Sequence, residues 1–234
     1  MPIKAEEMKH MNEVNKTLYI PLYGKSSVSK KGIILKDPKA ELIWEKEGFP
    51  LKGKAKSKWL TYYMGMPKQC WYDVDFESVI EERKKYYKET EHYHMLVADA
   101  SKPAWIGKLP TAEHVIVVME GVSMYLKRQE LVQLFVALDK AFSHVHLLMD
   151  CYTEFAAKAS KYKNPINEVG AHLVYGLDEP KYPEQQTDIR FIAERDMTPD
   201  ELIGELRGFE KVFFKCVLGG NLSKKMYRLY EYEK

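Results

Sequence analysis

The sequence predicts an α/β fold in which a mostly parallel sheet carries helices on both faces. Strand-like and helix-like segments alternate from residue 70 onward. The segments at 114–120 and 144–150 are apolar over most of their length, as is typical of strands that are covered on both faces. With 234 residues, of which 45% are hydrophobic, the chain can bury the core of one such domain.

The first 66 residues are less regular than the rest. A short amphipathic helix is predicted at 4–15, and an irregular segment with proline and glycine follows it. Asp37 is positioned to cap a second helix, with Pro38 in its first turn and Gly48 at its end. This part is therefore expected to be mainly helical, without a strand of the sheet.

The elements of the sheet follow from residue 70 in chain order. A segment of low periodicity at about 151–187 is interpreted as an insertion in a domain that spans 67–234. A late helix is predicted to begin at Thr198, with Pro199 at its first position. The remaining predictions are helices at 77–90 and 128–142 and strands at 70–76, 93–99, 114–120, 144–150, 188–197 and 224–233.

Charge and cysteine content restrict the function classes. Thirty-six basic and 34 acidic residues leave a net charge of +2, so neither a nucleic acid nor a membrane is expected as a partner. Cys70, Cys151 and Cys216 are odd in number and far apart, which argues against a disulfide framework. The N-terminus is polar and contains acids, unlike a signal peptide. We therefore expect a soluble, cytoplasmic protein.

Acidic residues end three successive predicted strands. Asp75, Asp99 and Glu120 stand at the carboxyl ends of strands, the edge where open α/β sheets bind ligands. Any one of them could instead cap the following helix. Together they suit a ligand with an adenosine and a cation, because carboxylates accept from ribose hydroxyls and from the adenine amino group. This favours S-adenosylmethionine over a dinucleotide, whose pyrophosphate requires a glycine turn.

Several segments, among them DVDF at 73–76 and EGVSMYL at 120–126, resemble the leucine carboxyl methyltransferase-like family of S-adenosylmethionine-dependent O-methyltransferases. The resemblance implies a Rossmann-like methyltransferase fold with a seven-stranded sheet, and a helical cap formed by residues 1–66 over the substrate pocket. The most specific segments are DVDF at 73–76 and EGVSMYL at 120–126. The other matching segments are 33–44, 59–66, 77–87 and 223–234.

The resemblance also assigns roles to the acids. It implies that Asp75 holds the ribose, that Asp99 accepts from the adenine amino group, and that Glu120 lies near the methionine part of the cofactor. No catalytic residue is assigned by it.

Three further residues complete the expected cofactor site. Gly121 follows Glu120 at a turn where the backbone must pass close to a ligand. The resemblance implies that Tyr125 lines the pocket. It also implies a lysine of the N-terminal segment near the cofactor carboxylate, for which Lys25 is the nearest candidate.

The sequence departs from the family in one place. Family members have a helix, a first strand and a glycine-rich turn before the segment that resembles 71–76. Here only Pro67, Lys68 and Gln69 separate Met66 from Cys70, so a unit of roughly 30 residues is missing. Such a loss removes hydrogen-bond partners from neighbouring strands and should weaken cofactor binding. Either the chain is a shortened member, or the sequence is part of a longer protein.

The expected activity is transfer of a methyl group to a carboxylate or hydroxyl oxygen. The substrate is expected to be a small molecule or a protein C-terminal carboxylate, and the oligomeric state is open. A carboxylate acceptor needs no general base, whereas a phenol does, and His172 and Tyr152 are the candidates for that role. The alternative function is a non-catalytic binding or scaffold module. A nucleotide-dependent oxidoreductase is a poorer interpretation, since the chain has no GxGxxG motif.

Histidine and cysteine patterns do not predict another site. His92 and His94, like His144 and His146, are spaced to share one face of a strand. Neither pair has a recognisable third ligand, so no metal site is predicted. Cys151 has no histidine nearby in the sequence, which disfavours a nucleophilic role.

Overall fold

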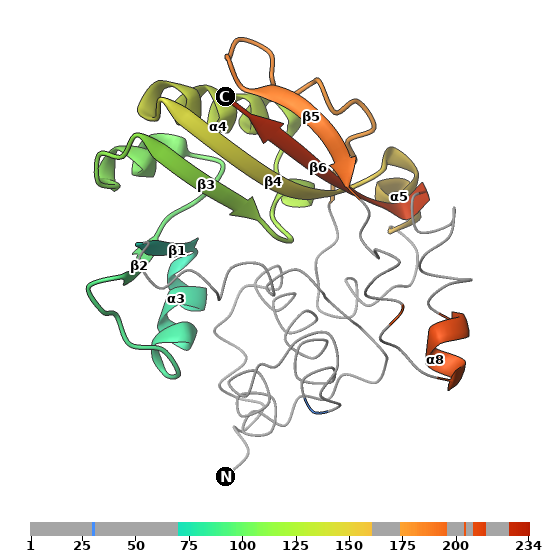
Figure 1. Ribbon diagram of the computed structural model, residues 1–234, viewed down its shortest axis with the longest axis horizontal. Helices are drawn as coiled ribbons and strands as arrows, with labels where there is room; N and C mark the ends of the chain where they lie inside the picture. The colour runs from blue at the N-terminus through green and yellow to red at the C-terminus, as the bar shows by residue number, and fades with distance from the viewer. Residues whose placement is uncertain (1–29, 31–69, 161–173, 196–203, 205–207, 214–224) are drawn as a thin grey trace. The chain divides into compact units, whose positions relative to one another are not determined.

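The computed structural model describes residues 30, 70–160, 174–195, 204, 208–213 and 225–234 (Figure 1). The chain divides into two compact units, one formed by Met1–Val97 with Asp200–Val212 and the other by Ala98–Pro199 with Phe213–Lys234. Each unit is described by itself below. The predicted helices of the first 66 residues, the junction at 66–69 and the helix start at Thr198 lie outside the described residues.

The first unit contains a parallel pair of strands joined by a helix. Strand β1 (Trp71–Asp75) leads into α3 (Glu77–Lys84), and β2 (Tyr93–Val97) follows. The strands are parallel, with Asp75 opposite Val97. Both strands predicted here are confirmed. A short helix, α8 (Gly208–Phe213), comes later in the chain.

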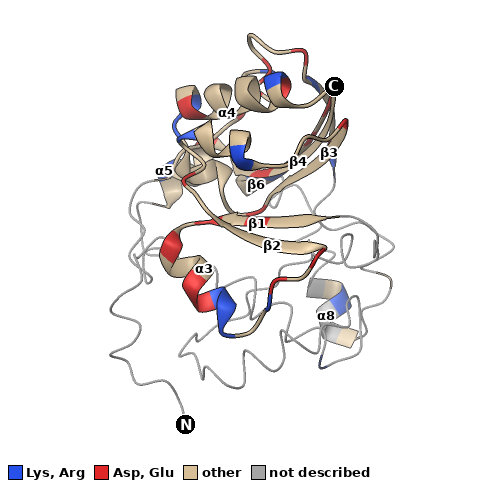
Figure 2. Cartoon of the chain, turned by 90° about the vertical axis from the view of Figure 1, so that its left-hand side faces the viewer, with Lys and Arg blue, Asp and Glu red and all other residues tan. Residues whose placement is uncertain are grey.

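Helix α3 ends six residues before the predicted end at Thr90. It has Glu77 in its first turn and basic residues in its last turn, an arrangement that suits the helix dipole and that Figure 2 shows in red and blue. Beyond Lys84 the chain must turn back to begin β2, and the Thr90 N–H donates to the Tyr93 carbonyl at 2.9 Å to close that turn. The prediction at 77–90 was too long because periodicity alone does not reveal where the next strand must start.

The second unit is built on a four-stranded sheet in the order β3-β4-β6-β5 (Figure 1). Neighbours β3 and β4 are parallel, and β6 is antiparallel to both of its neighbours. The predicted α/β class is confirmed, with two parallel and two antiparallel strand pairs among the described residues. The elements are η4 (Pro103–Lys108), β3 (His114–Met119), η5 (Ser123–Tyr125), α4 (Arg128–Ala141), β4 (His144–Tyr152), α5 (Glu154–Ala159), β5 (Arg190–Arg195) and β6 (Tyr227–Glu233).

The core of this unit lies between the sheet and α4. Apolar residues recur along α4 at helical spacing, and its buried side includes Phe135 and Leu138. They pack in one cluster with Leu147 of β4 and with Tyr230 and Tyr232 of β6. Strand β6 lies inside the sheet, between β4 and β5. None of the helices in the described part of the chain has the length and apolar character required to cross a bilayer.

The segment predicted as an insertion begins within the sheet. Strand β4 continues past the predicted end at Asp150 to Tyr152, because β6 pairs with it as far as Tyr227. Thr153 then caps α5, its Oγ1 accepting from the Ala156 N–H at 3.0 Å. Leu177 of the same segment is buried in the main core. The described part of this segment is thus integral to the unit.

Gly176 provides a test of this packing. A Cβ added at Gly176 would lie 2.4 Å from the Glu154 Cα and backbone nitrogen, which cannot give way without moving the chain. We expect Gly176→Ala to lower the free energy of unfolding by about 1–3 kcal/mol, measured by urea denaturation. Gly107→Ala is the matched control, because in the part of the chain that the structure describes no atom lies within 4 Å of the added Cβ. Equal stability of the two variants would contradict the close approach.

Candidate functional site

A buried carboxylate lies where β3 ends and β4 continues. Met119, the last residue of β3, is opposite Met149, and Asp150 is the next residue of β4. The Asp150 side chain is 1% exposed. The Gly121 N–H donates to it, at 2.9 Å from each carboxylate oxygen, and the Tyr227 hydroxyl donates to its Oδ2. Asp150 therefore joins the end of β3 to β4 and β6.

The turn after β3 has a backbone conformation that favours glycine. Gly121 has a φ of 68°, in the left-handed region. The Ser123 hydroxyl donates to the Asp150 carbonyl, so the turn is attached to β4 through main-chain as well as side-chain atoms. The Glu120–Gly121 turn thus lies at the carboxyl end of β3, as the sequence predicts, and Asp150 holds it there.

Burial raises the pKa of Asp150 to about 7. Hydrogen bonds from Tyr227 and Gly121 oppose this shift, while the negative charge of Glu120 adds to it. Burial and the charge of Asp150 also raise the pKa of Tyr227, so its hydroxyl keeps the proton that it donates. A cation bound beside Glu120 would favour the ionised form of Asp150.

Tyrosine side chains form an aromatic cluster next to these acids. Tyr125, Tyr152 and Tyr227 pack against a group of buried residues that includes Met124. The rings of Tyr152 and Tyr227 meet edge to face, with centroids 5.3 Å apart. Aromatic faces and nearby carboxylates both attract a cation. Tyr125 belongs to this cluster, and its role in lining a cofactor pocket stays a prediction.

The proposed base candidates gain no support. Burial, with the neighbouring Tyr125 and Asp150, raises the pKa of Tyr152, so this phenol stays protonated at neutral pH and cannot accept a proton. His172 lies outside the described residues. Cys151 is 1% exposed and burial raises the pKa of its thiol, as expected for a structural cysteine.

Asp75 and Asp73 lie on the same face of β1 but have different partners. The Phe76 N–H donates to Asp75 Oδ1 at 2.8 Å, and burial raises the Asp75 pKa although this bond opposes the shift. Asp73 accepts from Arg83 of α3 at 2.9 Å and from the Tyr93 hydroxyl of β2. Asp73 thus connects β1 with α3 and β2, whereas Asp75 stands at the strand end.

Asp99 organises the turn before η4. Its Oδ1 accepts from the Ser101 N–H at 2.9 Å and from the Ser101 hydroxyl at 2.6 Å. Lys102 Nζ lies 3.2 Å from its other oxygen. Burial opposes ionisation of Asp99, but these hydrogen bonds outweigh it and lower the pKa. Asp99 therefore has a structural role in this turn, and its binding of adenine stays a prediction.

The remaining predicted residues fall in different places. Asp75 belongs to the first unit, and Asp99 and Glu120 belong to the second. Lys25 lies outside the described residues. Sequence reasoning missed Asp150 and its partner Tyr227, although Asp150 was a fourth acid at the end of a predicted strand.

Comparison with known proteins shows one curated sequence relative and several structural matches. No protein-family model matches the chain. The tetracenomycin polyketide synthesis O-methyltransferase TcmP of Streptomyces glaucescens is 25% identical over 142 residues, which are 60% of this chain and 53% of that protein. The match thus spans about half of the relative's length.

The structural matches are more distant in sequence. A proposed methyltransferase from Thermobifida fusca YX aligns with a TM-score of 0.48 and 12% identity, covering 94% of this chain and 80% of that one. An S-adenosylmethionine-dependent methyltransferase from Mesorhizobium loti aligns with a TM-score of 0.48 and 11% identity, over 71% of this chain and 81% of that one.

The titration of Asp150 should make stability depend on pH. Its pKa rises from 3.8 to about 7 on folding, so the folded protein holds the proton more tightly than the unfolded chain does. Stability from this group is complete below about pH 4 and falls as pH rises to about 7, by at most about 1.4 kcal/mol per pH unit. Asp150→Asn should remove this component, which urea denaturation between about pH 5 and pH 8 measures. Parallel pH profiles of the parent and the variant would contradict the raised pKa.

Proposed function

We propose that this chain is an S-adenosylmethionine-dependent methyltransferase that transfers a methyl group to a carboxylate or hydroxyl oxygen. The observation that carries the proposal is the Glu120–Gly121 turn, held by buried Asp150 beside a tyrosine cluster at the carboxyl end of β3. Open α/β sheets bind their ligands at this edge. The similarity to TcmP supports oxygen as the acceptor atom.

The residues present fit the methionine end of this cofactor. Gly121 has no side chain, so a ligand can approach the backbone at this turn. No atom of the described residues lies within 4 Å of a Cβ built there. Glu120 and Asp150 offer negative charge to a ligand that carries a sulfonium and an ammonium group. The half-buried carboxylate of Asp75, at the end of β1, fits a role in holding ribose hydroxyls.

Catalysis would depend mainly on positioning and on exclusion of water. When bound, S-adenosylmethionine supplies a methyl group whose bond to sulfur breaks as the acceptor oxygen attacks in line. Glu120 and Gly121 would hold the methionine part of the cofactor in place. The tyrosine cluster would exclude water beside it. Tyr152 keeps its proton, so it is not the base for a hydroxyl acceptor. A carboxylate acceptor needs no base, which makes it the simpler substrate for these residues.

The near balance of charges supports a small molecule or a protein C-terminal carboxylate as the substrate rather than a nucleic acid or a membrane. TcmP acts in polyketide synthesis, which is consistent with a small-molecule acceptor.

The second candidate function is a non-catalytic binding or scaffold module. Its support is that β1 pairs with β2 alone among the described strands, and that the sequence contains no glycine between Met66 and Ile106. Calorimetric titration of the purified chain with S-adenosylhomocysteine separates the two candidates. Binding is expected for the enzyme, and no binding at millimolar ligand would favour the module.

The ribose role of Asp75 has a matched control in the same strand. We expect Asp75→Ala to weaken S-adenosylhomocysteine binding by about 2–3 kcal/mol, because two charge-assisted hydrogen bonds would be lost. Asp73→Ala should instead lower the free energy of unfolding, since Asp73 accepts from Arg83 and Tyr93. Calorimetry and urea denaturation measure the two effects. Equal loss of affinity in both variants, with folding intact, would refute the assignment.

The role of Glu120 is tested by comparing a charged and an uncharged ligand. Glu120→Gln keeps the shape of the side chain and removes its charge. Affinity for the cationic S-adenosylmethionine should therefore fall more than affinity for the thioether S-adenosylhomocysteine. Calorimetric titrations of the parent and the variant give the ratio of the two affinities. An unchanged ratio would mean that Glu120 acts only in the structure of the turn.

A further inference from the structure

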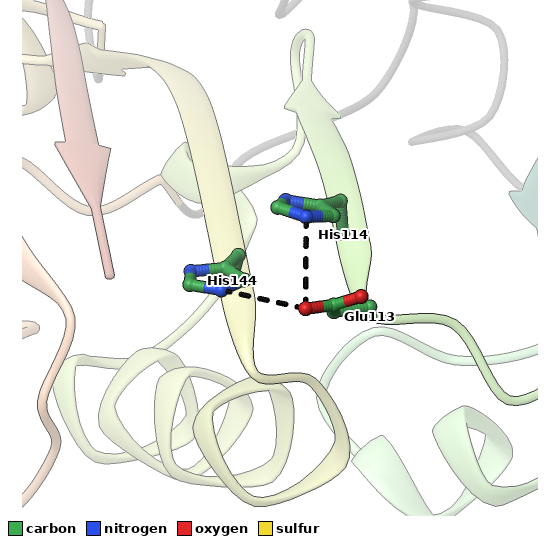
Figure 3. Close-up of side chains that lie close together, drawn as sticks. All are labelled: Glu113, His114 and His144. Carbon is green, nitrogen blue, oxygen red and sulfur yellow. Dashed lines mark ion pairs between the residues drawn. The ribbon is translucent and has the colours of Figure 1, made fainter.

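Three side chains of types that can coordinate a metal lie close together at the start of β3 and β4: Glu113, His114 and His144 (Figure 3). The parallel strands begin in register, so His114 and His144 are directly opposite each other. The backbone N–H of His144 donates to the backbone carbonyl of Glu113 at 2.9 Å. This bond fixes the residue before β3 against the start of β4. The backbone that carries all three side chains is therefore held by the sheet itself.

The donor atoms of this cluster are close together. The Glu113 Oε1 lies 4.0 Å from the Nε2 of His114 and 4.0 Å from the Nε2 of His144. The two imidazoles are stacked, with centroids 4.4 Å apart and planes 12° from parallel. All three ligand atoms lie within 4.8 Å of one another. One carboxylate oxygen thus faces two imidazole nitrogens.

We propose that Glu113, His114 and His144 form a binding site for a divalent transition-metal ion of the Zn²⁺ class. Two histidines and one glutamate are a ligand set that zinc uses, with water in the remaining position. Ligand atoms in a tetrahedral zinc site are about 3.3–3.5 Å apart, so the donors must approach each other by roughly 1 Å. The rings must also tilt until their Nε2 lone pairs converge. The side chains are 73%, 73% and 52% exposed, so they can rotate without any change in the strands.

The neighbouring histidine of β4 shows what an ordinary surface contact looks like in this sheet. His146 Nε2 lies 2.8 Å from Glu231 Oε1, and Arg195 already binds the other oxygen of Glu231. The Glu231 carboxylate therefore also binds the guanidinium of Arg195, which does not coordinate metals. Glu113, in contrast, is within 4.0 Å of two imidazoles. His146 is therefore the matched control, being exposed and on the same face of the same strand.

The site is separate from the proposed methyl-transfer site. It lies at the amino ends of β3 and β4, whereas Glu120 and Asp150 follow the last paired residues at their carboxyl ends. A metal ion bound there would cross-link the first residues of β3 and β4. Because it would bind the folded chain and not the unfolded one, it would stabilise the unit by mass action. Methyl transfer would not require it.

Calorimetric titration of the full chain with Zn²⁺, after removal of any affinity tag and of bound metal by a chelator, tests the proposal. One ion per chain is expected, with affinity falling at acidic pH because protons compete for the imidazoles. His114→Ala, His144→Ala and Glu113→Gln should each weaken binding by about tenfold or more. His146→Ala should leave it unchanged. Co²⁺ should give the visible absorption of a tetrahedral site in the parent and not in His144→Ala.

No Zn²⁺ binding by the folded parent, or equal weakening by His146→Ala and His144→Ala, would show an exposed cluster without a metal role. Thermal unfolding provides a second measurement that does not depend on activity. Saturating Zn²⁺ should raise the Tm of the parent and of His146→Ala, and it should not raise the Tm of His144→Ala. An equal rise in all three would place the metal elsewhere.

Discussion

The buried carboxylate of Asp150 is the interaction that joins the turn after β3 to β4 and β6 in the second unit. It is buried, and it accepts from the Gly121 N–H on one side and from the Tyr227 hydroxyl on the other. Because those partners belong to the turn after β3 and to the first residue of β6, one side chain connects three strands of the sheet. A buried carboxyl group is costly unless its oxygens are bonded, and here they are. Loss of this group would leave the Gly121 N–H and the Tyr227 hydroxyl without this acceptor.

The same interaction explains why an acidic turn can persist at this edge. Glu120 is adjacent to Asp150 in space, and its charge contributes to the raised pKa of that carboxyl. Two carboxyl groups that are close together each make ionisation of the other less favourable. A cationic ligand would relieve this repulsion, which is the physical basis for proposing S-adenosylmethionine.

In the first unit, two acids of β1 illustrate how position along a strand separates roles. Asp73, inside the strand, is paired with Arg83 and Tyr93 and so holds the helix and the neighbouring strand. Asp75, at the strand end, accepts only a local N–H among the hydrogen bonds of the described residues. The spacing of two residues puts both on one face, but only the strand end belongs to the edge where ligands bind.

The sequence by itself determined the positions of β1, β2, β3 and α4, because apolar periodicity and turn residues act within a few positions of the chain. It also determined the turn at Gly121, where a glycine follows a strand-ending acid. Only the tertiary structure decided that β6 lies inside the sheet, that β4 extends to Tyr152, and that the Asp150 carboxylate accepts from Gly121 and Tyr227. His114 and His144 likewise meet only through strand pairing, being 30 residues apart. Such contacts join segments far apart in the chain, and local spacing carries no information about which strands become neighbours.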